Sequence, residues 1–284
     1  APCSVTRVII SPMVLFVLGL VGLTYLPLVV WRGPEPLSAV EIAELALFHF
    51  LVAMLLASYF MTVCVDPGTP PAWWLERELQ SGNPSQYRRC AKSSVLKPPR
   101  AHYCSVTRRL VLNMDHFCPW VDNTVGYYNR KFFILFLLYA CATCLYAAGL
   151  LYARGAMNLQ RPRSRGDVAG AVGGSAMSLM AMMVDGALGV ALIFFGYFHL
   201  SMACKNETTI ESCGMADPRY DLGTEGNLEQ VFGRNRWLWP LPVYGAGPVG
   251  NGIHWPTRDF AVGEEGDTSR ILSDVGDFSS DDSV

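Results

Sequence analysis

Residues 90–131 read CAKSSVLKPPRAHYCSVTRRLVLNMDHFCPWVDNTVGYYNRK and stand between two pairs of long apolar blocks. Within this stretch, Asp115, His116 and Cys118 fall within four residues of one another. A thiolate is the nucleophilic form of cysteine, and a neighbouring base or positive charge lowers the pKa of the thiol. Histidine titrates near neutral pH and accepts that proton, while an adjacent aspartate orients the imidazole and stabilises its cation. The cluster therefore predicts a nucleophilic cysteine, although its spacing alone leaves a metal half-site or a chance cluster open.

Four long blocks with almost no charge flank this stretch, two on each side. An α-helix needs about 20 apolar residues to cross about 30 Å of hydrocarbon, and lipid requires every backbone polar group to be satisfied internally. We therefore predict an all-α membrane protein. A signal peptide is the alternative for the first block, and a buried core helix is the alternative for the second or the fourth. The four transmembrane helices are expected at about residues 8–30, 45–65, 132–153 and 184–204.

The fourth block carries one acidic residue, Asp185, and acidic side chains are costly at the centre of a bilayer. The charge-free part from Gly186 to Cys204 is long enough to span the hydrocarbon, so we expect Asp185 near the outer end of this span. We expect the Gly-, Ala- and Arg-rich segment before it to be a loop. Gly189, like Gly186, suits either a close approach of two helices or the shaping of a cavity.

The composition excludes several classes of protein. Hydrophobic residues make up 51% of the 284 residues and charged residues only 16%, and the mean hydropathy is +0.25. A soluble domain typically carries about 25% charged residues, so neither a soluble globule nor a disordered chain fits. The net charge of -2 provides no basic field that would attract a nucleic acid. The nine cysteines are odd in number and several sit in apolar blocks, so we expect reduced thiols and not a disulfide scaffold.

Lysine and arginine residues set the expected orientation, because cytoplasmic loops of membrane proteins carry an excess of them. Of the 22 lysines and arginines, five lie in the two loops that connect the spans within each hairpin. The other 17 lie in the segments on the opposite side of the membrane. We therefore expect both termini and the central segment to be cytoplasmic. The expected domains are a transmembrane hairpin at 1–65, a cytoplasmic catalytic module at 66–131, a second hairpin at 132–204, a cytoplasmic extension at 205–260 and an acidic, disordered tail at 261–284.

Several motifs, in the correct order, resemble the DHHC family of protein S-palmitoyltransferases. The resemblance implies four spans with a catalytic module between the second and the third. It also implies transfer of palmitate from palmitoyl-CoA, as co-substrate, to cytosolic cysteines of substrate proteins in the Golgi, the endoplasmic reticulum or the plasma membrane. The matching segments are DPG at 66–68, KPPRAHYC at 97–104, DHFCPW at 115–120, NTVG at 123–126, TTIE at 208–211 and DPRYDLGTEGNLEQVFG at 217–233.

The resemblance assigns the catalytic roles residue by residue. Cys118 attacks the thioester and forms an acyl-enzyme, His116 is the base, and Asp115 orients His116. Thr209 is expected to contact the region of Asp115. The acyl chain is expected to lie among the four spans.

Further residues receive supporting roles from the same resemblance. Glu211 and Asn227 are expected to fix the C-terminal extension against the spans. Lys97 and Arg100 are candidates for binding the phosphates of CoA by charge pairing, with ordinary surface charge as the alternative. Membrane lipids and an accessory protein are the other expected partners. A catalytically inactive membrane scaffold or adaptor is the alternative function.

The module departs from the family at its zinc ligands. The family's cysteine-rich segment binds two zinc ions, each through three cysteines and one histidine, and a structural zinc needs four nitrogen or sulfur ligands. Only Cys90 and Cys104 retain such a donor, and they belong to different sites, so we predict that no zinc is bound. Phe117 replaces a zinc ligand and not the base. The eight corresponding positions hold Cys90, Ser93, Tyr103, Cys104, Thr107, Leu110, Phe117 and Thr124.

Overall fold

The fold is given by a computed structural model. It describes residues 11–30, 36–80, 87–159, 168–214, 216–245 and 247–258, without the side chains of residues 157–173. The acidic tail expected at 261–284 lies outside the described residues.

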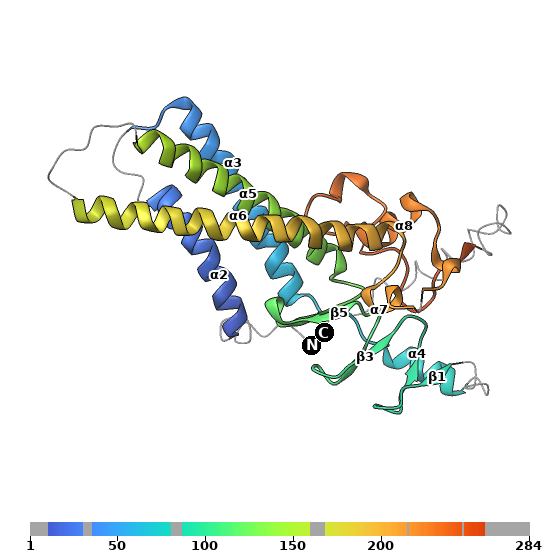
Figure 1. Ribbon diagram of the computed structural model, residues 1–284. Helices are drawn as coiled ribbons and strands as arrows, with labels where there is room; N and C mark the ends of the chain where they lie inside the picture. Colours follow the sequence, from blue (N-terminus) through green and yellow to red (C-terminus); the bar gives the residue numbers. More distant parts are fainter. Residues whose placement is uncertain are drawn as a thin grey trace, which may run out of the picture.

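Four long helices form the membrane part of the chain, and the four predicted spans are confirmed by length and composition. Figure 1 shows α5 lying along α3 and α6, and these two helix pairs make the most extensive contacts in the described chain. The helices are α2 (Pro12–Tyr25), continued by the π-helical turn η1 (Leu26–Val30), α3 (Ala39–Cys64), α5 (Arg130–Leu159) and α6 (Val168–Cys204). The apolar segments long enough to cross a membrane are Pro12–Val30, Ala39–Cys64, Arg130–Ala156 and Gly174–Cys204.

Helix α3 begins before the charge-free block that predicts it. Ser38 and Glu41 form a capping box: the Ser38 hydroxyl accepts from the Glu41 backbone N–H at 3.3 Å, and the Glu41 carboxylate accepts from the Ser38 N–H at 2.9 Å. This reciprocal pair satisfies two backbone donors that a helix start otherwise leaves open. Acidic residues are favourable near a helix N-terminus, so their charge does not end the helix.

The connection between α5 and α6 is shorter than the predicted loop, because most of the Gly- and Ala-rich segment is helical. Asp185 therefore lies well inside α6, whereas the sequence places it at the start of the fourth span, expected at about 184. Its carboxylate is buried, and the Thr24 hydroxyl on α2 lies 2.9 Å from both of its oxygens. Apolar residues before Asp185 continue the helix, and Thr24 provides the polar partner that an acid inside a membrane protein needs.

Gly189 lets α5 and α6 approach each other closely. A Cβ atom at this position would lie only 2.7 Å from Cδ2 of Leu145 on α5, whereas a Cβ atom at Gly186 would meet nothing within 4 Å. Small residues serve such close packing in membrane helices, where lipid gives little hydrophobic drive for association. Of the two roles that the sequence leaves open, the structure gives Gly189 the packing role.

Three short antiparallel ribbons build the module between α3 and α5, so the predicted all-α class describes the membrane part only. Each strand has two or three residues, which is too short for an alternating pattern to be read from the sequence. The ribbons pair β1 (Arg88–Arg89) with β2 (Leu96–Lys97), β3 (His102–Cys104) with β4 (Arg109–Val111), and β5 (His116–Cys118) with β6 (Asn123–Val125). A short helix, α4 (Ala72–Gln80), precedes them.

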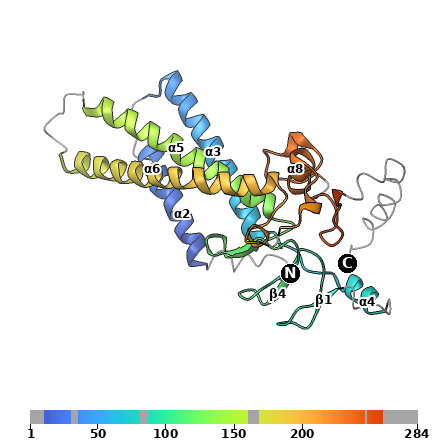
Figure 2. The same cartoon turned by 45° about the vertical axis from the view of Figure 1, so that its right-hand side comes forward.

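The C-terminal extension packs against both the spans and the module. Figure 2 shows its helix α8 beside the ends of α5 and α6, on the same end of the bundle as the module. Val231 and Phe232 of α8 join a core with residues of α5 and α6, and Ile253 joins the core of the module with Trp74 and Tyr127. The elements of the extension are α7 (Thr209–Ser212), η4 (Pro218–Tyr220), α8 (Thr224–Phe232) and η5 (Arg236–Leu238).

Candidate active site

The β5–β6 ribbon carries the predicted nucleophile and is anchored to the end of α3. The Asn123 side chain donates to the backbone oxygens of Thr62 and Val63 at 3.1 Å and of Val65 at 3.0 Å, which are among the last carbonyls of that helix. Tyr59 on α3 donates its hydroxyl to the backbone oxygen of Trp120 at 2.9 Å. The ribbon is therefore fixed where the second span ends.

The strand geometry explains the spacing of the histidine and the cysteine. Successive side chains of a strand point to opposite faces, so His116 and Cys118 share one face of β5 and Phe117 points to the other. Cys118 is only 4% exposed and packs in an apolar core with Val14 of α2 and Phe133 of α5. The structure thus places the sulfur next to the imidazole and against the apolar interior of the bundle.

Asp115 holds the imidazole from the side opposite the sulfur. Its carboxylate is 1% exposed and accepts from His116 Nδ1 at 2.6 Å. It also accepts from the backbone N–H of Thr209 at 3.0 Å and from the Thr209 hydroxyl at 2.7 Å. Arg130 lies 3.9 Å away. The expected contact between Thr209 and the region of Asp115 is therefore present.

The electrostatics of the pair follow from these contacts. Burial raises the pKa of Asp115, but the hydrogen bond from His116 and the nearby Arg130 outweigh it and leave the pKa below its usual range. Burial lowers the pKa of His116, but hydrogen bonds to Asp115 and Cys118 and the charges of both raise it to about 9. At neutral pH the imidazole therefore carries a proton, and its positive charge lies beside Cys118.

Arg100 has partners other than the CoA expected from the sequence. It is 7% exposed, and its Nε and Nη2 each lie 2.7 Å from one oxygen of Glu211. The guanidinium lies over the rings of Tyr220 and Trp255, 4.9 and 4.4 Å from their centroids. Asn206 accepts a further hydrogen bond at 3.0 Å. The module is thus tied to the segment that follows α6.

The other expected supporting residues have distinct surroundings. Asn227 is buried, donates to the Cys204 backbone oxygen at 2.8 Å and to Asp221 at 2.6 Å, and so joins the extension to the end of α6. Lys97 lies on β2, with Nζ 3.4 Å from His102 Nδ1, and stays partly exposed. Burial lowers the pKa of Lys97.

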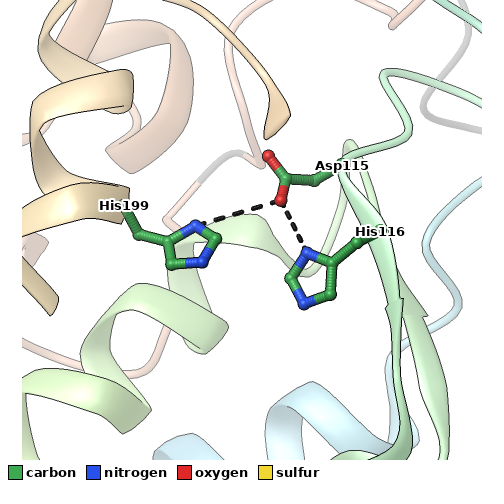
Figure 3. A group of neighbouring side chains, drawn as sticks. All are labelled: Asp115, His116 and His199. Carbon is green, nitrogen blue, oxygen red and sulfur yellow. Dashed lines mark hydrogen bonds and ion pairs between the residues drawn. The ribbon is translucent and has the colours of Figure 1, made fainter. Parts of the chain in front are cut away.

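Two residues at the site were missed by the sequence analysis. His199 on α6 faces Asp115, and Arg130 sits at the start of α5 (Figure 3 shows His199 and His116 on either side of the Asp115 carboxylate). A lone histidine in a charge-free span is a functional signal, because ionisable groups are rare inside membranes. His199 carries that signal, because it lies in the charge-free part of the fourth apolar block.

The side chains at the family's zinc positions do not fit a zinc ion. The Cys104 sulfur accepts from the Thr124 hydroxyl at 3.2 Å and from the Thr107 N–H at 3.5 Å, and both threonines occupy former ligand positions. Phe117 packs on the apolar cluster that contains Cys104. Within the described ranges, neither Cys90 nor Cys104 belongs to a group of three or more potential metal ligands.

The group of Asp115, His116 and His199 has ligand atoms within 4.8 Å of one another. It is a poor cation site, because the Arg130 guanidinium lies 3.9 Å from the carboxylate. The hydrogen bond between Asp115 and His116 also occupies the atoms that would bind the metal.

Comparison with known proteins gives consistent matches. A model of the DHHC palmitoyltransferase family matches residues 83–215. "Probable protein S-acyltransferase 13" and "Probable protein S-acyltransferase 14" of Arabidopsis thaliana are 36% and 37% identical to the chain, over 85% of the chain and 87% of each relative. "Palmitoyltransferase ZDHHC20" of Homo sapiens is 32% identical over 76% of the chain and 67% of its own length.

The buried pair between Arg100 and Glu211 generates a stability prediction. We expect Glu211→Gln to lower the free energy of unfolding by about 3–5 kcal/mol, because it leaves a buried guanidinium without its anion. Chemical denaturation of the detergent-solubilised protein measures this loss. Asp217→Asn is the matched control, because it breaks the exposed pair with Arg219 and is expected to cost less than about 1 kcal/mol. Equal, small losses in both variants would contradict the prediction.

Proposed function

We infer the mechanism from one premise: the chain belongs to the DHHC palmitoyltransferase family and is a protein S-acyltransferase. It is an integral membrane protein that transfers palmitate to protein cysteines. The observation that carries the assignment of roles is the chain of hydrogen bonds from Thr209 through Asp115 to His116, beside Cys118. This arrangement supports the nucleophile, the base and the orienting carboxylate that the resemblance implies.

In the first half-reaction, Cys118 attacks the carbonyl carbon of palmitoyl-CoA as the thiolate, with its proton held on His116. The bond between that carbon and the CoA sulfur breaks, and CoA leaves with the proton from His116. The product is an acyl-enzyme on Cys118. The buried Asp115 carboxylate stabilises the imidazolium through both stages.

In the second half-reaction, a substrate cysteine gives its proton to His116 and attacks the acyl carbon. The bond to Cys118 breaks, and the sulfur returns as a thiolate beside the imidazolium. One histidine thus acts as the acid toward CoA and then as the base toward the substrate cysteine in each cycle. No further proton acceptor is required, because the proton that leaves with CoA is replaced by the proton of the substrate cysteine, which restores the ion pair at the end of the cycle.

We place the acyl chain in the apolar interior that adjoins Cys118. The apolar cluster around the sulfur draws residues from several spans, including Val14, Tyr59 and Leu137. A buried CH₂ group contributes about 0.8 kcal/mol, so a long chain gains affinity from such surroundings. The partly exposed Lys97 is our candidate for the CoA phosphates, whereas the buried pair of Arg100 with Glu211 favours a structural role.

We propose that both termini and the module face the cytosol, as the distribution of basic residues favours. The sulfur then meets cytosolic CoA and cysteines of cytosolic segments. The membrane is that of the Golgi, the endoplasmic reticulum or the plasma membrane. An inactive scaffold is the alternative, and the lost zinc ligands are the observation that favours it.

A labelling experiment separates the enzyme from the scaffold. We expect the purified protein to take up label from an alkyne analogue of palmitoyl-CoA, and hydroxylamine to remove it because thioesters are cleaved by this reagent. Cys118→Ser should remain folded and unlabelled, while Cys213→Ser, at an exposed position, should label like the wild type. A folded wild-type protein without hydroxylamine-sensitive label would leave only the scaffold.

The pKa of His116 predicts a pH dependence. Because this pKa is raised to about 9, the proton stays on the imidazole at neutral pH and is lost as the pH rises through about 9. We expect CoA release in the first turnover to be level up to about pH 8 and to fall above about pH 9, because the departing sulfur loses its proton donor. His116→Gln should react slowly and show no such fall. A wild-type rate that keeps rising above this pH would exclude His116 as the donor.

We also propose that the module folds without zinc. The hydrogen bonds to the Cys104 sulfur and the packing of Ile253 into the module core support this proposal. We expect elemental analysis of the purified protein to give far less than one zinc per chain, and EDTA to leave its unfolding temperature unchanged. About two zinc ions per chain, the number that the family's ligand pattern implies, would contradict the proposal.

A further inference from the structure

His199 is a buried imidazole that the mechanism above does not use. It lies on α6, five residues before the helix ends at Cys204, and is 2% exposed. Its Nδ1 faces Asp115 Oδ2 at 3.9 Å, the same oxygen that accepts from His116 Nδ1 and from the Thr209 hydroxyl (Figure 3). The two imidazole rings lie 5.5 Å apart, on either side of the carboxylate.

Aromatic rings fix the orientation of this imidazole. Phe133 on α5 and Phe195 on α6 meet it edge to face, with ring centroids 4.9 and 4.6 Å away, and Phe198 lies at 5.3 Å. A ring enclosed in this way loses little further freedom when it contacts the carboxylate, since packing has already selected its rotamer. The cage therefore presents Nδ1 to Asp115 in one geometry.

We propose that His199 is a positioning residue for the acyl transfer: its caged ring, with Nδ1 3.9 Å from Asp115 Oδ2, keeps the carboxylate in the orientation that His116 requires. The proposal rests on the proposed roles of Asp115 and His116. The charged and titratable groups that face His199 are Asp115, His116 and Arg130. With His199 in place, the carboxylate is contacted from the β5 ribbon, from α6 and from the start of α7.

The arrangement couples the membrane bundle to the reaction. Thr209 follows the end of α6 and His199 lies within its last turns, so one helix and its continuation supply both contacts. A shift of α6 relative to the β5 ribbon would remove both contacts from the carboxylate. The catalytic pair is therefore complete only when the fourth span is docked.

Three substitutions at one position test this role. Phenylalanine keeps an aromatic ring in the cage and removes the nitrogen. Asparagine places an amide nitrogen near the position of Nδ1, and glutamine places it near the position of Nε2. We expect His199→Phe to slow CoA release in the first turnover by about tenfold, as for the loss of a contact to a charged group. His199→Asn should recover most of the rate, and His199→Gln should not.

The pH profile separates positioning from packing. In His199→Phe, the Asp115 carboxylate interacts with the imidazole of His116 alone. The pKa of His116 should therefore rise, and the fall in rate should move to higher pH. Phe198→Leu, which alters the cage at a partly exposed position, should leave the profile unmoved. Equal rates for the Phe and Asn variants, or an unmoved profile in the Phe variant, would overturn the proposal. Absence of label on the wild type would instead overturn the proposed function.

Discussion

The buried carboxylate of Asp115 is the constraint on which the active site depends. An anion removed from water is costly unless every lone pair finds a donor or a positive charge. Here the partners come from parts of the chain that are far apart in sequence: His116 beside it, Arg130 at the start of α5, and Thr209 after α6. The ribbon, the third span and the end of the fourth span must therefore assemble before the pair with Cys118 is complete.

A second buried ion pair makes that assembly rigid. Arg100 belongs to the module and Glu211 to the segment after α6, so their bidentate contact connects the same two regions as the contact of Asp115 with Thr209. Asn227 adds a third connection between the extension and the end of α6. These contacts join the module to the segment after α6 and join the extension to the end of α6, whereas zinc ions bound by the family's ligand pattern support the module only from within. A module without zinc would depend on these contacts for its support.

Local sequence patterns predicted the positions of the spans and of the Asp-His-x-Cys cluster. They did not predict which residues far apart in the sequence contact each other. Runs of apolar residues identify spans because lipid admits few alternatives, and the Asp-His-x-Cys spacing brings His116 and Cys118 together because a strand puts alternate residues on one face. The strands of two or three residues are too short to show an alternating pattern in the sequence. The partner of Asp185 was not predicted, because Thr24 lies 161 positions earlier in the chain. Arg100 looked like a surface cation because its acid, Glu211, follows the last span, and His199 drew no attention because its carboxylate lies in the module.

The contact between Thr24 and Asp185 has a consequence for biosynthesis. The first span leaves the ribosome long before the fourth, so the threonine enters the lipid with its hydroxyl bonded only to its own helix, as the contact with the Leu20 backbone oxygen allows. The acid arrives later, and that hydroxyl lowers the cost of burying it in the helical bundle. Insertion of the last span is therefore coupled to retention of the first beside it, and a nascent chain that loses the first hairpin exposes an acid to quality control.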